Sequence, residues 1–234
     1  GSSSMQGVLA AGTVRGGASC NCFIYTLAPH CHGTHTECVG HVTDNAAELA
    51  TLTPVPPALA ALVSVRPESL GAAAALASGP RAPGDPVITR AALAVAAARW
   101  VRDPWTALVI RTLPNDPDKR HRQYAGACPA PYFTADAMQW IVEREVTSLV
   151  VDLPSLDRAE DGGALSAHRI YWGLPPGAVD AHRARRGRAL VTELAYAPDS
   201  APDGLYLLDL HVPAFAADAA PSRPVLYPVT ELAP

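Results

Sequence analysis

Apolar residues are grouped in short runs along the chain, and each run predicts one strand. Most of these runs are rich in Val, Ile and Leu, which favour the extended backbone. In residues 147–151 the apolar residues follow one another without alternating, which indicates a strand covered on both faces. The predicted strands are residues 22–27, 62–65, 107–112, 147–151, 189–194 and 204–212.

Two segments between these strands predict helices. Residues 90–102 are rich in alanine, with Leu93, Val95 and Trp100 available for burial. A second helix is expected to begin after Thr134 and to run to about Arg144. Strands and helices are mixed and no repeat is visible, so a single α/β domain is expected over residues 5–234. Residues 1–4 precede Met5 and are interpreted as the remnant of an expression tag.

Composition and charge exclude several classes of partner. The chain has 234 residues, of which 49% are hydrophobic, and a net charge of −4. Nucleic-acid binding needs a broad basic surface, and the one basic cluster, residues 183–188, is short. No apolar run reaches the roughly 18 residues that a membrane span requires, and no secretion signal follows Met5. A cytoplasmic location and a small-molecule substrate are therefore expected.

The cysteines do not predict a disulfide framework, because their number, five, is odd and no secretion signal is present. Four of them, Cys20, Cys22, Cys31 and Cys38, fall within nineteen residues. Small buried thiols on strands would explain this crowding. A zinc site with four thiolates is the alternative, although the spacing lacks paired C-x2-C knuckles.

Potential metal ligands are concentrated between residues 30 and 41. Half of the chain's eight histidines lie there. An exposed loop that happens to be rich in histidine is the alternative interpretation. The potential ligands are His30, Cys31, His32, His35, Glu37, Cys38 and His41. Such a mixture of imidazole, carboxylate and thiolate groups is typical of zinc sites.

The spacing of these residues requires a bent backbone. Cys31, His35 and Glu37 share one face of an extended chain, but about 20 Å of straight strand separates Cys31 from Glu37. Gly33 is the natural place for a bend. His41 lies farther away, and a second turn at Gly40 would bring it close enough for proton transfer.

Later in the chain, His168 and Glu193 are further candidate ligands. His168 follows a turn-rich segment, and Glu193 is a carboxylate inside a mostly apolar strand, where an unpaired charge would be costly. A surface histidine and a solvent-facing glutamate remain the alternatives. The chain contains no G-x-S-x-G, P-loop, G-x-G-x-x-G or H-E-x-x-H motif, so other common catalytic and nucleotide sites have no support.

The pattern of the ligand-rich segment resembles the putative-cyclase family of metal-dependent hydrolases, which includes kynurenine formamidase and isatin hydrolase. That family carries H-x-G-T-H-x-D-x-P-x-H, and residues 31–41 read C-H-G-T-H-T-E-C-V-G-H. Four later segments are also similar, namely residues 108–112, 150–157, 167–169 and 191–194, as is the C-terminal segment 218–226.

This resemblance implies a compact α/β domain of the swivelling β/β/α type, with a barrel-like mixed sheet and flanking helices. It also implies hydrolysis of an amide, formamide or cyclic amide by a metal-activated water, in a dimer or tetramer. Zn²⁺, one or two ions per chain, is the expected metal, with Mn²⁺ as an alternative. By resemblance, the metal ligands are Cys31, His35, Glu37, His168 and Glu193, and His41 is the general acid and base.

Three departures from the family pattern indicate a distinct subgroup. Cys31 stands where the family has His, Glu37 where it has Asp, and Val39 where it has Pro. A thiolate ligand would favour zinc over manganese. His32 is an alternative to Cys31 as the ligand. A zinc-binding protein of the same fold without hydrolytic activity remains the alternative function.

Overall fold

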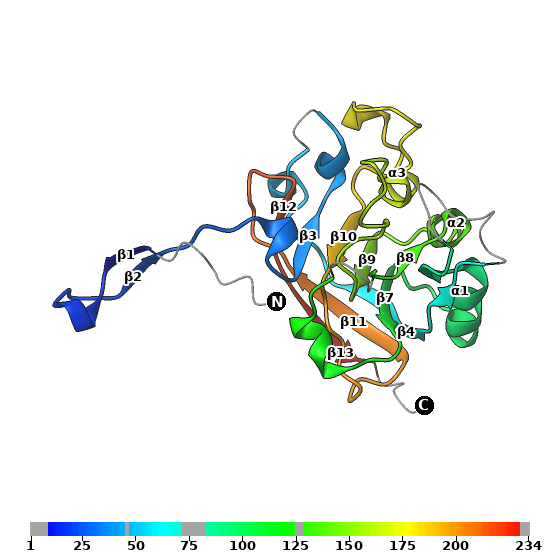
Figure 1. Cartoon of the computed structure of the whole chain (residues 1–234), viewed down its shortest axis with the longest axis horizontal. Coiled ribbons are helices and arrows are strands. Elements are labelled where there is room, and N and C mark those ends of the chain that lie inside the picture. Colours follow the sequence, from blue (N-terminus) through cyan, green and yellow to red (C-terminus); the bar gives the residue numbers. More distant parts are fainter. Residues whose placement is uncertain (1–8, 45–46, 72–82, 125–128, 230–234) are drawn as a thin grey trace.

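A computed structural model describes residues 9–44, 47–71, 83–124 and 129–229 of the chain. The main body is a curled sheet with helices packed against one side, and a thin arm projects from it (Figure 1). Residues 1–4, interpreted as a tag remnant, lie outside the described residues. Within the described part, no helix is long and apolar enough to cross a membrane.

Eight of the described strands form the central mixed sheet, in the order β12-β3-β10-β9-β7-β4-β11-β13. The four middle strands β4, β7, β9 and β10 are parallel to one another, and the outer pairings are antiparallel. The strands are β3 (His35–Glu37), β4 (Ala58–Val65), β7 (Ala107–Thr112), β9 (Ser148–Val151), β10 (Leu190–Glu193), β11 (Gly204–His211), β12 (Ala219–Pro221) and β13 (Arg223–Pro228).

The sheet separates two hydrophobic cores. On one face, residues such as Leu108 and Val151 pack against the helices α1 (Arg90–Ala97), α2 (Ala135–Glu143) and α3 (Ser166–Trp172). On the other face, Val109 and Val150 join residues of β11, such as Leu208, inside the curl of the sheet. β9 is buried along its whole length, as its unbroken apolar run predicted.

Most predicted elements are present, with shifted ends. The strand expected over residues 22–27 ends at Ile24, and the helix expected over 90–102 ends at Ala97 and continues as a 3-10 turn. β3, α3 and the short strand β1 (Leu9–Gly12) were not predicted. A small second sheet contains β5 (Glu68–Ser69), β6 (Pro86–Ile88) and β8 (Tyr132–Phe133).

The arm is an antiparallel hairpin of β1 with β2 (Cys22–Ile24), held away from the main body (Figure 1). Its large apolar side chains are exposed, with Phe23 at 44%, Ile24 at 49% and Tyr25 at 57%. The chain returns from the arm to the main body through a 3-10 turn, Pro29–Cys31, and then reaches β3.

Candidate metal centre

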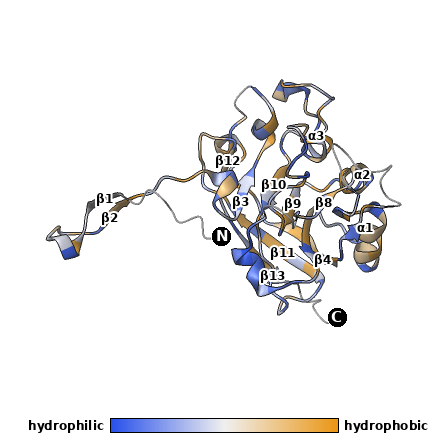
Figure 2. Ribbon diagram, in the orientation of Figure 1, coloured by the Kyte–Doolittle hydropathy of each residue, from blue (hydrophilic) through white to orange (hydrophobic). Residues whose placement is uncertain are grey.

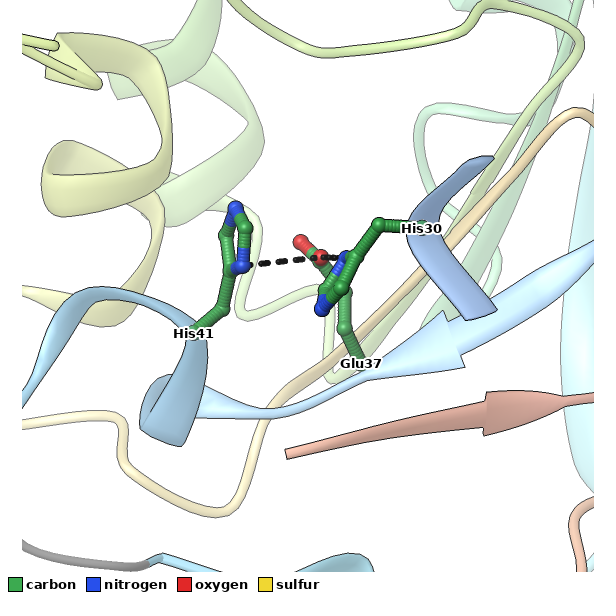
Figure 3. Close-up of side chains that lie close together, drawn as sticks. All are labelled: His30, Glu37 and His41. Carbon is green, nitrogen blue, oxygen red and sulfur yellow. Dashed lines mark ion pairs between the residues drawn. The ribbon is translucent and has the colours of Figure 1, made fainter. Parts of the chain in front are cut away.

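Five elements bring histidines and carboxylates to one place. The 3-10 turn Pro29–Cys31 supplies His30, β3 supplies His35 and Glu37, and the 3-10 turn Val39–Val42 supplies His41. Glu193 ends β10, which is paired with β3 so that Glu193 lies opposite His35. His168 comes from α3, which follows β9 along the chain. Figure 3 shows the side chains of His30 and His41 next to Glu37.

Two glycine-containing turns make this convergence possible. Gly33 has a φ of 137°, which favours glycine, and the backbone changes direction there before β3 begins. Gly40 lies in the 3-10 turn after β3, so close to the carbonyl of Ala47 that a side chain would collide with it. The expected bend at Gly33 and the second turn at Gly40 are both present.

Glu37 lies at the centre of the cluster. Its side chain is fully buried, and two sets of potential ligands share it, His30–Glu37–His41 and His35–Glu37–Glu193. Within each set, the potential ligand atoms lie within 4.8 Å of one another. His168 adds a further imidazole, with Nε2 at 2.9 Å from Glu37 Oε1 and 3.3 Å from Glu193 Oε1. One carboxylate between two sets of ligands is the arrangement of a bridged two-metal site.

The buried polar atoms of the cluster fit a metal ion. His35 Nε2, His168 Nε2 and both carboxylate oxygens of Glu37 are buried without a hydrogen-bond partner in correct geometry. A buried polar atom without a partner is costly, and most proteins contain few of them. Here these atoms converge from two elements, β3 and α3, as ligands of a shared cation would.

In His35 and His168 the other ring nitrogen, Nδ1, is held by a hydrogen bond. His35 Nδ1 donates to the carbonyl of Gly33 at 2.9 Å, and His168 Nδ1 donates to Asp157 Oδ2 at 2.7 Å. Each hydrogen bond fixes the tautomer in which Nδ1 carries the proton, so the lone pair of Nε2 is free to bind a metal. Asp157 also accepts hydrogen bonds from the amides of Ala167 and His168, so it positions the start of α3 as well.

In His30 the two ring nitrogens exchange roles, so that Nε2 makes the orienting hydrogen bond and Nδ1 faces Glu37. Its Nε2 is hydrogen-bonded to Asp218 Oδ2 at 2.8 Å, and its Nδ1 lies 3.0 Å from Glu37 Oε2. Asp218 precedes β12, which pairs with β3. His30 Nδ1 is therefore the atom that would bind a metal beside Glu37.

The charges of the cluster shift its pKa values strongly. Burial lowers the pKa of His30, but the hydrogen bond to Asp218 and the contacts with Glu37 outweigh burial and raise that pKa to about 10. Burial also opposes the charged form of His168, yet the charge of Glu37 and the bond to Asp157 hold its pKa well above the ordinary value. Conversely, burial alone would raise the pKa of Glu37, and the charge of His168 keeps it below its usual range. A metal must displace protons from the imidazoles, so its affinity is expected to rise with pH.

The structure brings together His35, Glu37, His168, Glu193 and His41 of the predicted site, and it leaves Cys31 out. Cys31 is exposed and lines a neighbouring pocket with His32, and His30 lies beside Glu37 instead. Of the four clustered cysteines, Cys38 alone is buried, so the expectation of buried thiols is wrong for Cys20, Cys22 and Cys31. No candidate metal group among the described residues contains a cysteine.

Three residues of the centre were not assigned to the site from the sequence, although His30 was among the potential ligands. His30 was one histidine among several, and its position in a 3-10 turn was not foreseen. Asp157 belongs to the D-x-x-S-x-D segment, which was the available signal for it. Asp218 is the first residue of the C-terminal segment 218–226 that resembles the family, and strand pairing brings it to the site.

The chain is similar to a known sequence family. The sequence model of a family described as "Putative cyclase" matches residues 10–158, which is more than half of the chain. No significant relative was found among curated proteins.

Three solved structures share the fold at low sequence identity. "The Structure Of Potential Metal-Dependent Hydrolase With Cyclase Activity" is 14% identical, with a TM-score of 0.57, and the match covers 94% of this chain and 85% of that one. A "predicted metal-dependent hydrolase from Bacillus stearothermophilus" is 15% identical, with the same TM-score and coverage. Isatin hydrolase A from Labrenzia aggregata is 15% identical, with a TM-score of 0.56 and coverage of 93% and 80%. The α/β architecture with a barrel-like mixed sheet and flanking helices is thus that of cyclase-family structures.

Proposed function

The chain belongs to the putative cyclase family, and we propose that it is a metal-dependent hydrolase that cleaves a carbon–nitrogen bond of an amide, formamide or cyclic amide. The observation that carries this proposal is the buried cluster around Glu37, in which His35 Nε2, His168 Nε2 and both oxygens of Glu37 have no hydrogen-bond partner. The solved structures of similar fold include an isatin hydrolase and proteins described as metal-dependent hydrolases, which supports the same reaction class.

One or two divalent ions would be held by five side chains, with Glu37 as the shared ligand. The five are His30, His35, Glu37, His168 and Glu193. A bound ion supplies an activated water near neutral pH and polarises the carbonyl of the substrate. This set contains imidazole and carboxylate groups without a thiolate, and Zn²⁺ and Mn²⁺ both accept such ligands. A thiolate from Cys31 therefore no longer supports zinc over manganese. On the family resemblance we propose Zn²⁺, with Mn²⁺ as the alternative.

His41 is suited to move protons during hydrolysis. Its Nδ1 lies 3.8 Å from Glu37 Oε2, and its side chain is 25% exposed, so it can reach both the centre and a bound substrate. Its ring lies 4.2 Å from that of His30, measured between centroids. An imidazole so placed can accept a proton from the attacking water and deliver it to the leaving nitrogen.

A zinc-binding protein without turnover is the competing function. A structural zinc site needs four ligands and leaves no open position. The cluster offers more than four potential ligands and a partly exposed histidine beside them, which favours catalysis.

Metal removal and reconstitution test the proposed function. We expect the chelated protein to lose hydrolysis of a panel of aryl formamides and cyclic amides, and addition of Zn²⁺ or Mn²⁺ to restore it. Elemental analysis of the purified protein should give one or two ions per chain. Stoichiometric metal without hydrolysis of any panel member would favour the non-catalytic function.

We also propose that the chain forms a homo-oligomer through its arm. An isolated two-stranded hairpin is at best marginally stable in water, and exposed apolar side chains such as those of Phe23 and Ile24 mark interaction surfaces. Light scattering after size exclusion should show a dimer or tetramer. A Phe23→Ser, Ile24→Ser variant should be monomeric, and Val95→Ser, at an exposed apolar residue of α1, should leave the mass unchanged. A monomeric wild type would contradict the proposal.

A further inference from the structure

A pocket of about 680 Å³ lies next to the metal centre. Its size falls within the range of small-molecule sites. Thr34 and Leu194 line it, and they directly precede His35 and directly follow Glu193 in the chain. A hydrogen bond of 2.7 Å from Thr34 Oγ1 to the carbonyl of Leu194 joins the two strands at this point. The pocket therefore begins within one residue of two potential ligands.

The pocket lies at the carboxyl ends of the parallel strands. Asp152 and Leu194 line it directly after β9 and β10, and the turn Pro117–His121, which follows β7, supplies a further wall. In open α/β sheets, ligands bind at this edge. The turn consists mainly of hydrophilic residues (Figure 2).

The lining of the pocket is strongly basic although the whole chain is acidic. Its one carboxylate, Asp152, is neutralised by Lys119, whose Nζ lies 2.8 Å from Asp152 Oδ2. The other cationic side chains of the lining include Arg120, Arg122 and Arg223. Among the described residues, none of these three arginines has an ion pair with a carboxylate.

Arg120 is partly held in position at the pocket. Its guanidinium lies over the ring of Tyr196, 5.4 Å from the centroid, and its Nε donates to the carbonyl of Pro117 at 3.2 Å. Tyr196 also lines the pocket. An arginine stacked on an aromatic ring keeps its other N–H groups free to bind an anion.

We propose that this pocket binds an anionic group of the substrate, a carboxylate or a phosphate, while the scissile carbon–nitrogen bond lies at the metal centre. The assignment of the anion to the substrate rests on the proposed hydrolase function. The binding of small anions by the arginines does not depend on that function, and it can be measured without turnover.

A matched pair of substrates tests the proposal. 4-Formamidobenzoate and 4-formamidobenzamide have the same shape and differ in charge. We expect the metal-loaded wild type to prefer the carboxylate in kcat/KM, with a preference that falls as salt rises. In the double variant Arg120→Gln, Arg223→Gln, KM for the carboxylate should rise about tenfold or more, since bonds to charged groups are the strong ones. KM for the amide and kcat for both should stay unchanged, as should all values in Arg102→Gln, an exposed arginine outside the pocket.

Calorimetry separates this proposal from the proposed function. 4-Aminobenzoate and 4-aminophenyl phosphate are titrated into the metal-loaded protein, with 4-aminobenzamide as the neutral control. Binding of either anion that weakens in the double variant supports an anion site, and the tighter anion identifies the class. Such binding without cleavage of either formamide would count against the hydrolase function alone. Cleavage of both formamides with equal KM, or no anion binding that depends on Arg120 and Arg223, would overturn the anion site alone.

Discussion

Glu37→Gln is expected to abolish metal binding at the shared position and to lower turnover by more than about 100-fold. Loss of residues that merely orient metal ligands already costs about 10–100-fold, and Glu37 contributes both oxygens to the cluster. Glutamine has the same size but replaces one oxygen by an amide nitrogen, which cannot bind a metal. Elemental analysis and steady-state hydrolysis of the amide panel would measure the two losses.

Two further variants show whether the loss comes from the carboxylate. Glu37→Asp restores the residue that the family pattern has at this position, and it should retain more metal and activity than Glu37→Gln. Glu143→Gln removes a carboxylate from a surface ion pair, at 2.9 Å from Arg90, and should change neither metal content nor activity. Full metal content in a folded Glu37→Gln protein, judged by circular dichroism, would refute the central role of Glu37.

The sequence predicted the strands of the sheet better than their order. Apolar runs identified β7, β9, β10 and β11 with ends shifted by about one residue, because burial on the sheet imposes these patterns locally. The pairing of β3 with β10 and β12 joins segments more than 150 residues apart in the chain. No local pattern encodes such pairings, so the barrel-like sheet was expected from family resemblance alone.

The lack of a local signal for tertiary structure also explains why the sequence pointed to Cys31 and the structure places His30 beside Glu37. Cys31 was predicted as a ligand from the family resemblance, and the alternation of side chains in an extended segment placed it on the same face as His35 and Glu37. The structure has a 3-10 turn over Pro29–Cys31, in which neighbouring side chains are separated by about 120° instead of 180°. The turn and the bend at Gly33 bring His30 to Glu37, and Asp218, from the far end of the chain, holds it there. For Glu193, in contrast, a local signal was available, because a carboxylate in an apolar strand requires a partner if it is buried, and Glu193 is buried.

The variants His30→Ala and His41→Ala are expected to differ in metal content and in kcat, although the two rings lie beside each other in Figure 3. His30 is oriented by Asp218 with Nδ1 only 3.0 Å from Glu37, so its loss should remove metal. His41 lies farther from Glu37, at 3.8 Å, and is the proposed proton carrier. His41→Ala should therefore keep its metal and lose about 100-fold to 10,000-fold in kcat, the usual contribution of general acid–base catalysis.

Metal content, kcat and the pH profile together distinguish the two roles. If His41 acts as the base, the pH profile of His41→Ala should differ from that of the wild type. The control His182→Ala alters an exposed histidine outside the cluster and should match the wild type. Loss of metal in His41→Ala would instead make His41 a ligand, as its place in the His30–Glu37–His41 set allows. The proton would then have to be carried by another group.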